Sequence, residues 1–206
     1  MEKRTSLSGY ASDVAPPNPL PSSEAAVAYY TVALTRSVSL LITGLFIAFT
    51  QNHTAQFGLV AFGVLALVTS VSLGVLARSS VMTAQGRGLH MWQALVSLVV
   101  GALALGLSQA GMLLLLWAIV LWAVLVGVAE IFAGWRLPPG VGSRTDWMVQ
   151  GAMTVILALI VLTQQADSVA VVGFFGAWAI VLGVYLAIAG LSARWASAEG
   201  AAKESA

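Results

Sequence analysis

Six long apolar segments constrain this chain more than any other feature of its sequence. Each is close to the roughly 20 apolar residues that a helix needs to cross the hydrocarbon core of a membrane. Open strands are excluded there because lipid leaves their backbone groups without partners. Charged residues make up only 8% of the chain, against about 25% in a soluble domain. We therefore predict an all-α integral membrane protein with six transmembrane helices, at residues 28–50, 57–77, 91–109, 112–135, 147–164 and 168–191.

All nine basic residues fall at one end of the predicted bundle. Cytoplasmic loops carry an excess of Lys and Arg, and the three short connections at the other end carry neither. The nine are Lys3, Arg4, Arg36, Arg78, Arg87, Arg136, Arg144, Arg194 and Lys203. We therefore expect both termini in the cytoplasm.

One membrane domain, residues 25–194, holds all six segments. Residues 1–24 contain four of the six prolines, so we expect a flexible cytoplasmic tail there. Residues 195–206 are expected to form a cytoplasmic C-terminal tail.

An internal repeat relates the fourth and sixth segments. The pattern Gly-Val-x-x-x-x-Ala-Gly begins at Gly127 and again at Gly183, 56 residues later, and ends at Gly134 and Gly190. We predict three parallel helix hairpins, at about 28–78, 91–136 and 147–194, which could close a bundle with pseudo-threefold symmetry. The four glycines are expected to allow close helix packing, and a substrate path lined by small residues is the alternative.

Glu130 is an acid inside an apolar segment, where a charge is costly. It lies six residues before Arg136, and Gly127 and Gly134 share its helix face, so we expect it to point into a helix contact. Arg36 enters its own segment from the same side, and we predict an Arg36–Glu130 ion pair. The pair could fix helix register, Glu130 could accept or sense protons, or the acid could face the cytoplasm without a role.

Trp122 and Trp178 occupy matching positions of the repeat near mid-depth. We expect them to fill the core of the bundle, and a surface facing a partner subunit, a lipid or a pigment is the alternative. The apolar helix surfaces predict contact with the lipid bilayer and leave open a homo-oligomer or a larger membrane complex. The net charge of +1 argues against a nucleic-acid partner.

Signatures of catalysis are lacking in the sequence. There is no phosphate-binding loop, His-Glu-x-x-His or Gly-x-Ser-x-Gly motif, and no cysteine. His53 and His90 are predicted on opposite faces and could not share a metal. We therefore expect no enzyme, no catalytic residue, no cofactor and no metal.

The segment from Gly127 to Leu137, at the end of the second predicted hairpin, carries a family resemblance. Its Gly-Val-x-Glu-Ile-x-x-Ala, followed by Trp-Arg-Leu, resembles the HdeD-like short-repeat bacterial membrane proteins, which include an acid-resistance membrane protein. The resemblance covers about residues 36–194 and implies six helices, the bacterial inner membrane and a role in acid survival. We expect a stress-protective protein or an accessory membrane subunit, with a small transporter or channel as the alternative.

Overall fold

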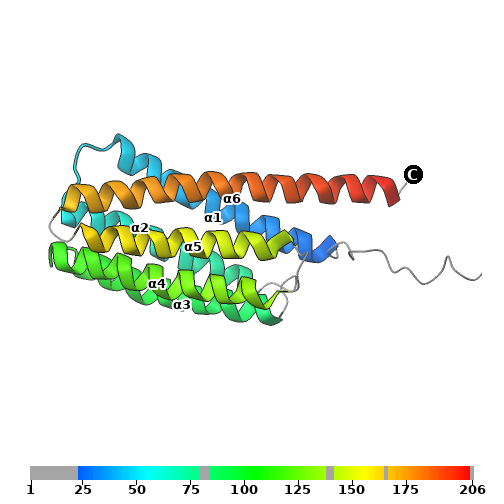
Figure 1. Ribbon diagram of the computed structural model, residues 1–206, viewed down its shortest axis with the longest axis horizontal. Helices are drawn as coiled ribbons and strands as arrows, with labels where there is room; N and C mark the ends of the chain where they lie inside the picture. The colour runs from blue at the N-terminus through cyan, green and yellow to red at the C-terminus, as the bar shows by residue number, and fades with distance from the viewer. Residues whose placement is uncertain (1–22, 79–83, 138–141, 165–166, 205–206) are drawn as a thin grey trace, which may run out of the picture.

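Six helices make up the described part of the chain, which is residues 23–78, 84–137, 142–164 and 167–204 of the computed structural model (Figure 1). No strand occurs in these ranges, and all six helices are long and apolar enough to cross a membrane. This confirms the predicted all-helical membrane class. The helices are α1 (Ser23–Phe49), α2 (Ala55–Ala77), α3 (Ala84–Gly106), α4 (Met112–Arg136), α5 (Gly142–Thr163) and α6 (Ser168–Glu204).

Four helices extend at least five residues beyond the predicted apolar segments. Helix α1 begins at Ser23 rather than 28, α3 at Ala84 rather than 91 and α5 at Gly142 rather than 147, and α6 runs to Glu204 rather than 191. Hydropathy marks only the part of a helix inside the apolar layer, whereas backbone hydrogen bonding continues into water. The expected C-terminal tail is therefore helical as far as Glu204. The expected N-terminal tail lies outside the described residues, except for positions 23 and 24.

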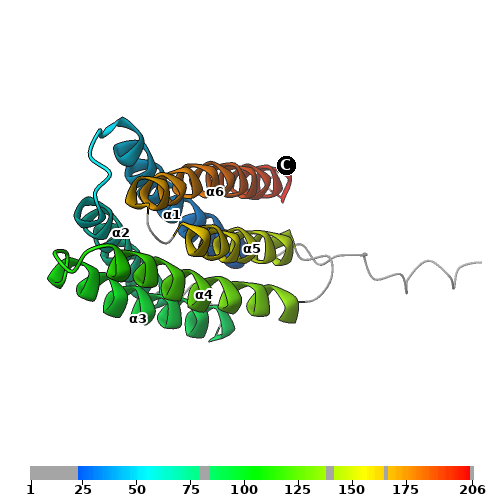
Figure 2. The same cartoon turned by 60° about the vertical axis from the view of Figure 1, so that its left-hand side comes forward.

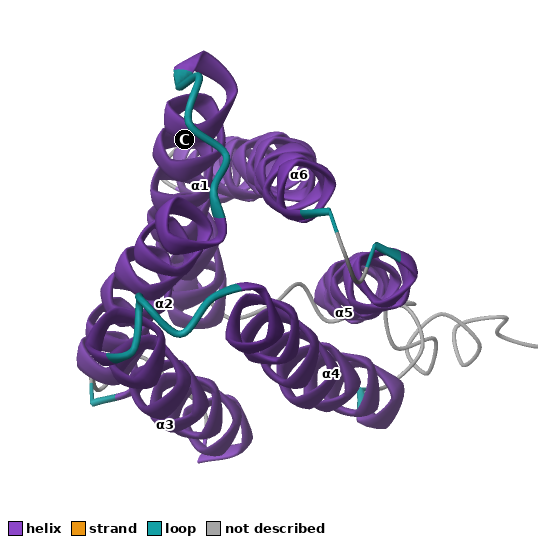
Figure 3. Ribbon diagram, turned by 90° about the vertical axis from the view of Figure 1, so that its left-hand side faces the viewer, coloured by secondary structure: helices purple, strands orange, loops and turns teal. Residues whose placement is uncertain are grey.

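The closest helix packing joins neighbouring hairpins (α1–α2, α3–α4 and α5–α6) to one another, the last one to the first included. The most extensive contacts are α1 with α6, α2 with α3, and α4 with α5. Seen from one end in Figure 3, the helices follow one another around the bundle in chain order, and α6 returns beside α1, as Figure 2 also shows. The start of α1 and the end of α6 lie at the same end of the bundle (Figure 1).

Glycines lie where these helices approach most closely. A Cβ added at Gly127 would stand 2.8 Å from the carbonyl oxygen of Gly151, and one at Gly134 would stand 3.0 Å from that of Arg144, both across the α4–α5 contact. Gly183 and Gly190 face α1 in the same way, with leucine side chains at 2.9 Å. The four glycines of the predicted packing motif thus lie in two of the three close interfaces.

An aromatic cluster fills the centre of the bundle. Trp122 packs edge to face on Phe62 and on Trp178, with ring centroids 5.6 Å apart in both pairs. Phe175 stacks on Trp178 at 5.9 Å and also contacts Phe62. Both repeat-related tryptophans are therefore core residues in this structure, at 3% and 8% exposure.

Candidate functional site

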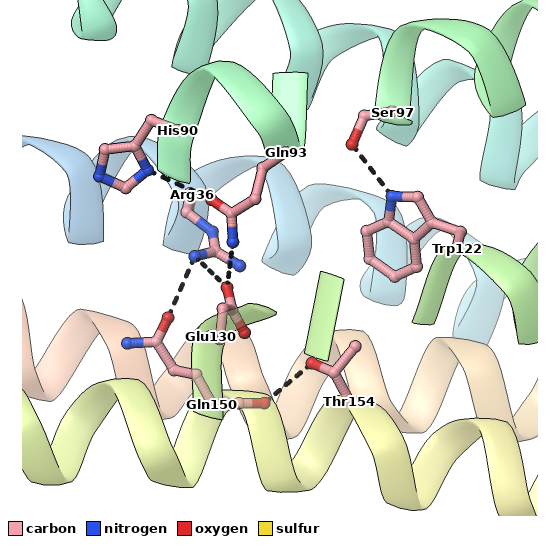
Figure 4. A network of polar contacts seen from close by, with 8 residues as sticks. All are labelled: Arg36, His90, Gln93, Ser97, Trp122, Glu130, Gln150 and Thr154. Carbon is pink, nitrogen blue, oxygen red and sulfur yellow. Dashed lines mark hydrogen bonds and ion pairs between the residues drawn. The ribbon is translucent and has the colours of Figure 1, made fainter. Parts of the chain in front are cut away.

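The predicted partners Arg36 and Glu130 are in contact inside the bundle. The Nη1 atom of Arg36 on α1 lies 2.8 Å from Oε1 of Glu130 on α4 (Figure 4). The Glu130 side chain is fully buried, and that of Arg36 is 9% exposed. Because each charge would be costly alone in this environment, each depends on the other.

Two glutamines hold the ion pair from either side. Gln93 on α3 donates through Nε2 to Oε1 of Glu130 at 2.7 Å, and Arg36 donates through Nη1 to Oε1 of Gln150 on α5 at 3.1 Å. Four helices thus meet at one pair of charges (Figure 4). Both donors to Glu130 use the same oxygen, and Oε2 is buried with no hydrogen-bond partner among the described residues.

His90 extends the network toward the end of the bundle where the termini lie. Its Nδ1 lies 3.2 Å from Oε1 of Gln93. Since the Gln93 amide nitrogen already donates to Glu130, this oxygen accepts and Nδ1 carries the proton. The His90 ring also lies 5.3 Å from the ring of Trp147, measured between centroids. A hydrogen-bonded chain therefore runs from His90 through Gln93 to Glu130.

Asp146 forms a second polar contact, one helical turn before Gln150 on α5. Tyr29 on α1 and Tyr185 on α6 both donate their hydroxyls to its carboxylate, Tyr185 at 2.7 Å. The two acids therefore have different partners, because Glu130 is held by a guanidinium and an amide, and Asp146 by two phenols.

Deeper in the bundle, the polar side chains form hydrogen bonds with the aromatic cluster and with the helix backbone. Trp122 donates from its indole nitrogen to the hydroxyl of Ser97 at 3.0 Å. Thr154 donates to the backbone carbonyl of Gln150 at 2.8 Å. The indole nitrogen of Trp178 is buried and has no partner among the described residues.

The histidines lie far apart, as their places in the sequence predict. His90 is buried in α3, whereas His53 lies in the connection between α1 and α2 at the opposite end, 3.4 Å from the carbonyl oxygen of Gln51. Within the described ranges no three His, Cys, Asp or Glu side chains form a group that could hold a metal ion.

Sequence reasoning missed the amides and His90 as parts of this site. One signal could have found the amides, because Arg36, Gln93 and Gln150 are spaced at equal intervals of 57 residues. The site therefore consists of three polar positions on α1, α3 and α5 and one acid on α4. Its central group is the buried carboxylate of Glu130. Oε1 of this carboxylate has two donors, and Oε2 has none among the described residues.

Comparison with known proteins gives no family assignment. No protein-family model, curated protein or solved structure matches the chain.

Proposed function

We propose that this chain is a non-enzymatic multi-pass protein of the bacterial cytoplasmic (inner) membrane, of the HdeD-like type, that protects the cell under acid or related stress. It acts alone or as an accessory subunit of a larger membrane complex. The observation that carries the proposal is the buried Arg36–Glu130 pair, tied to two glutamines across four helices. The two charges hold helices together, as a structural role requires.

The distribution of buried polar groups favours this role over transport. Among the described residues the buried polar side chains reach no deeper than Ser97 and Thr154, near the middle of α3 and α5. Beyond them, toward the short connections, the buried side chains are apolar. A path for a polar substrate needs polar groups across the whole bilayer.

The pattern of burial supports the proposed three parallel hairpins. At intervals of 57 residues, Arg36, Gln93 and Gln150 are buried on α1, α3 and α5. Glu130 on α4 corresponds in the same way to Leu73 on α2 and, 56 residues later, to Leu186 on α6, and all three are fully buried or nearly so. Equivalent positions are thus equivalently buried in all three hairpins.

Cytoplasmic termini are part of the proposal. Arg78 caps the end of α2, Arg136 ends α4 and Arg194 lies in the last third of α6, so all three lie toward the end of the bundle where α1 begins. An excess of arginine marks the cytoplasmic side. The many exposed apolar side chains on all six helices support a lipid-facing surface, part of which a second copy or a partner could cover.

Acid survival of a deletion strain tests the protective role. We expect deletion to lower survival after acid shock, and a plasmid copy of the wild-type gene or of Gly173→Ala to restore it, because a Cβ at Gly173 meets no atom within 4 Å. A Glu130→Gln copy should not restore it, since the amide carries no charge to compensate the buried Arg36. Unchanged survival of the deletion strain would contradict the proposal.

Native mass spectrometry distinguishes a protein that acts alone from an accessory subunit of a larger complex. The protein would be extracted from its own membranes at natural abundance in mild detergent. Recovery at constant stoichiometry with other chains identifies an accessory subunit, and recovery alone or as a homo-oligomer identifies an autonomous protein.

A small transporter or channel with a pseudo-threefold bundle is the alternative, because buried polar side chains extend from the level of His90 to Ser97 and Thr154 in the middle of the bundle. Flux of ions or small solutes in proteoliposomes tests it. Uptake that depends on the purified protein and is lost in Trp122→Ala would favour transport.

A further inference from the structure

Two arginines stand together where α4 ends and α5 begins. Arg136 is the last residue of the apolar span of α4, and Arg144 is the first residue of the apolar span of α5. The ends of such spans lie where hydrocarbon gives way to lipid headgroups. The α4–α5 contact brings the two residues close, since a Cβ at Gly134 would stand 3.0 Å from the carbonyl oxygen of Arg144. We call Arg136 and Arg144 the α4–α5 arginine patch.

No carboxylate of the described residues balances this patch. Their single ion pair joins Arg36 to Glu130 inside the bundle. Asp146 stands two residues after Arg144, but side chains two apart on a helix do not face each other. Its carboxylate accepts from tyrosines of α1 and α6 instead. Neither arginine of the patch donates a side-chain hydrogen bond within the described ranges.

The backbone at the start of α5 adds to the positive charge. Free N–H groups at a helix N-terminus carry a partial positive charge, which an acid usually balances. The first turn of α5 has no acid and contains Arg144. An anion from outside the chain is therefore the group that would neutralise this end of α5.

The side chain of Arg136 lies along a surface that faces lipid. Its guanidinium carbon is 4.1 Å from the centre of the Phe132 ring, which is 46% exposed. Trp135 lies beside Phe132, with ring centroids 6.3 Å apart, and is also exposed. Met148 of α5 lies next to Gly134 and is exposed too. The patch therefore borders an apolar surface on which acyl chains can lie.

We propose that the α4–α5 arginine patch binds one anionic phospholipid. The headgroup phosphate accepts hydrogen bonds from Arg136 and Arg144, because guanidinium and phosphate form strong, often bidentate pairs. The acyl chains lie against Phe132, Trp135 and Met148. A zwitterionic lipid fits less well, since its ammonium group would stand beside two guanidiniums. A free phosphate would leave the apolar surface uncovered. The site goes beyond the protective function proposed above and does not depend on it.

The repeat provides a matched control for this site. Arg78 caps α2 and Arg87 lies near the start of α3, so the α2–α3 contact carries the same two charges. The residues 58 positions before the two aromatic residues of the patch are Gly74 and Ala77. The α2–α3 arginines therefore lack the aromatic surface, and their removal tests charge alone.

Native mass spectrometry of the purified full-length protein in neutral detergent tests the site. Phosphatidylglycerol and phosphatidylcholine with the same acyl chains would be titrated separately against wild-type protein. We expect one phosphatidylglycerol to bind at least about tenfold more tightly than phosphatidylcholine. An excess of inorganic phosphate should leave the lipid bound. Equal affinity for the two lipids, or release of the lipid by inorganic phosphate, would overturn the proposal, and neither comparison requires a variant.

Two double variants locate the bound lipid. Arg136→Gln with Arg144→Gln should lower the affinity for phosphatidylglycerol about 30-fold, which corresponds to about 2 kcal/mol. Arg78→Gln with Arg87→Gln should leave it unchanged. All four side chains are partly or fully exposed, so we expect both variants to fold, and circular dichroism checks this. Equal losses of affinity in the two double variants would overturn the proposal, because they would show attraction to net charge alone.

Discussion

A double-mutant cycle at the buried ion pair tests the physical account of the site most directly. Its two variants are Arg36→Gln and Glu130→Leu, each of which installs the residue found at the corresponding positions of the other hairpins. Removing one partner of a buried pair typically costs about 3–5 kcal/mol, because the other charge remains uncompensated. Glu130→Leu also takes the acceptor from Gln93, which adds about 1–3 kcal/mol.

The combined variant should behave differently from the sum of its parts. With both charges gone the layer holds three glutamines on α1, α3 and α5 and three leucines on α2, α4 and α6, the pattern that the hairpins already share. Replacing both members of a buried pair is often neutral or stabilising, so we expect the free energy of unfolding to lie within about 1–2 kcal/mol of wild type.

Reversible unfolding in bicelles, measured for all four proteins, gives the coupling free energy. We expect a coupling free energy of about 4 kcal/mol or more. This is well above the small departure from additivity that two independent sites show. A double variant as unstable as the two single variants added together would refute the reasoning. It would mean that Gln93 and Gln150 depend on the charges for more than pairing.

Three further predictions address packing and orientation. Gly151→Ala should lower the free energy of unfolding by about 1–3 kcal/mol through contact with a facing backbone carbonyl, whereas Gly173→Ala should raise it by up to about 1 kcal/mol; equal effects in thermal unfolding would contradict the close α4–α5 contact. Trp122→Phe should destabilise the protein about 1–2 kcal/mol more than Trp178→Phe, because only Trp122 gives up a hydrogen bond; denaturant unfolding of both variants checks this, and the reverse order would count against it. In this cysteine-free chain, Gln109→Cys should react with a membrane-impermeant thiol reagent added to intact cells; labelling only after lysis would reverse the proposed orientation.

The membrane class and the ion pair follow from the sequence for simple physical reasons. An apolar run of about 20 residues has only one way to satisfy its backbone in lipid. Arg36 and Glu130 are the charges that interrupt such runs, and two opposite charges entering from one side need each other. Glycines in register mark close helix faces because few other residues permit that approach.

Apart from the 57-residue spacing of Arg36, Gln93 and Gln150, the rest of the site leaves no mark in the sequence, because it depends on helix rotation. Gln93 and Gln150 carry no charge and look like ordinary interface residues in a hydropathy plot. They become ligands of the ion pair only because α3 and α5 turn those faces inward. The close packing of α4 against α5 is also not evident from the sequence. The short connection between α3 and α4 suggests instead that α4 packs best against α3, its partner in the hairpin. Asp146, near the start of α5, gives no sign in the sequence that it meets tyrosines on α1 and α6.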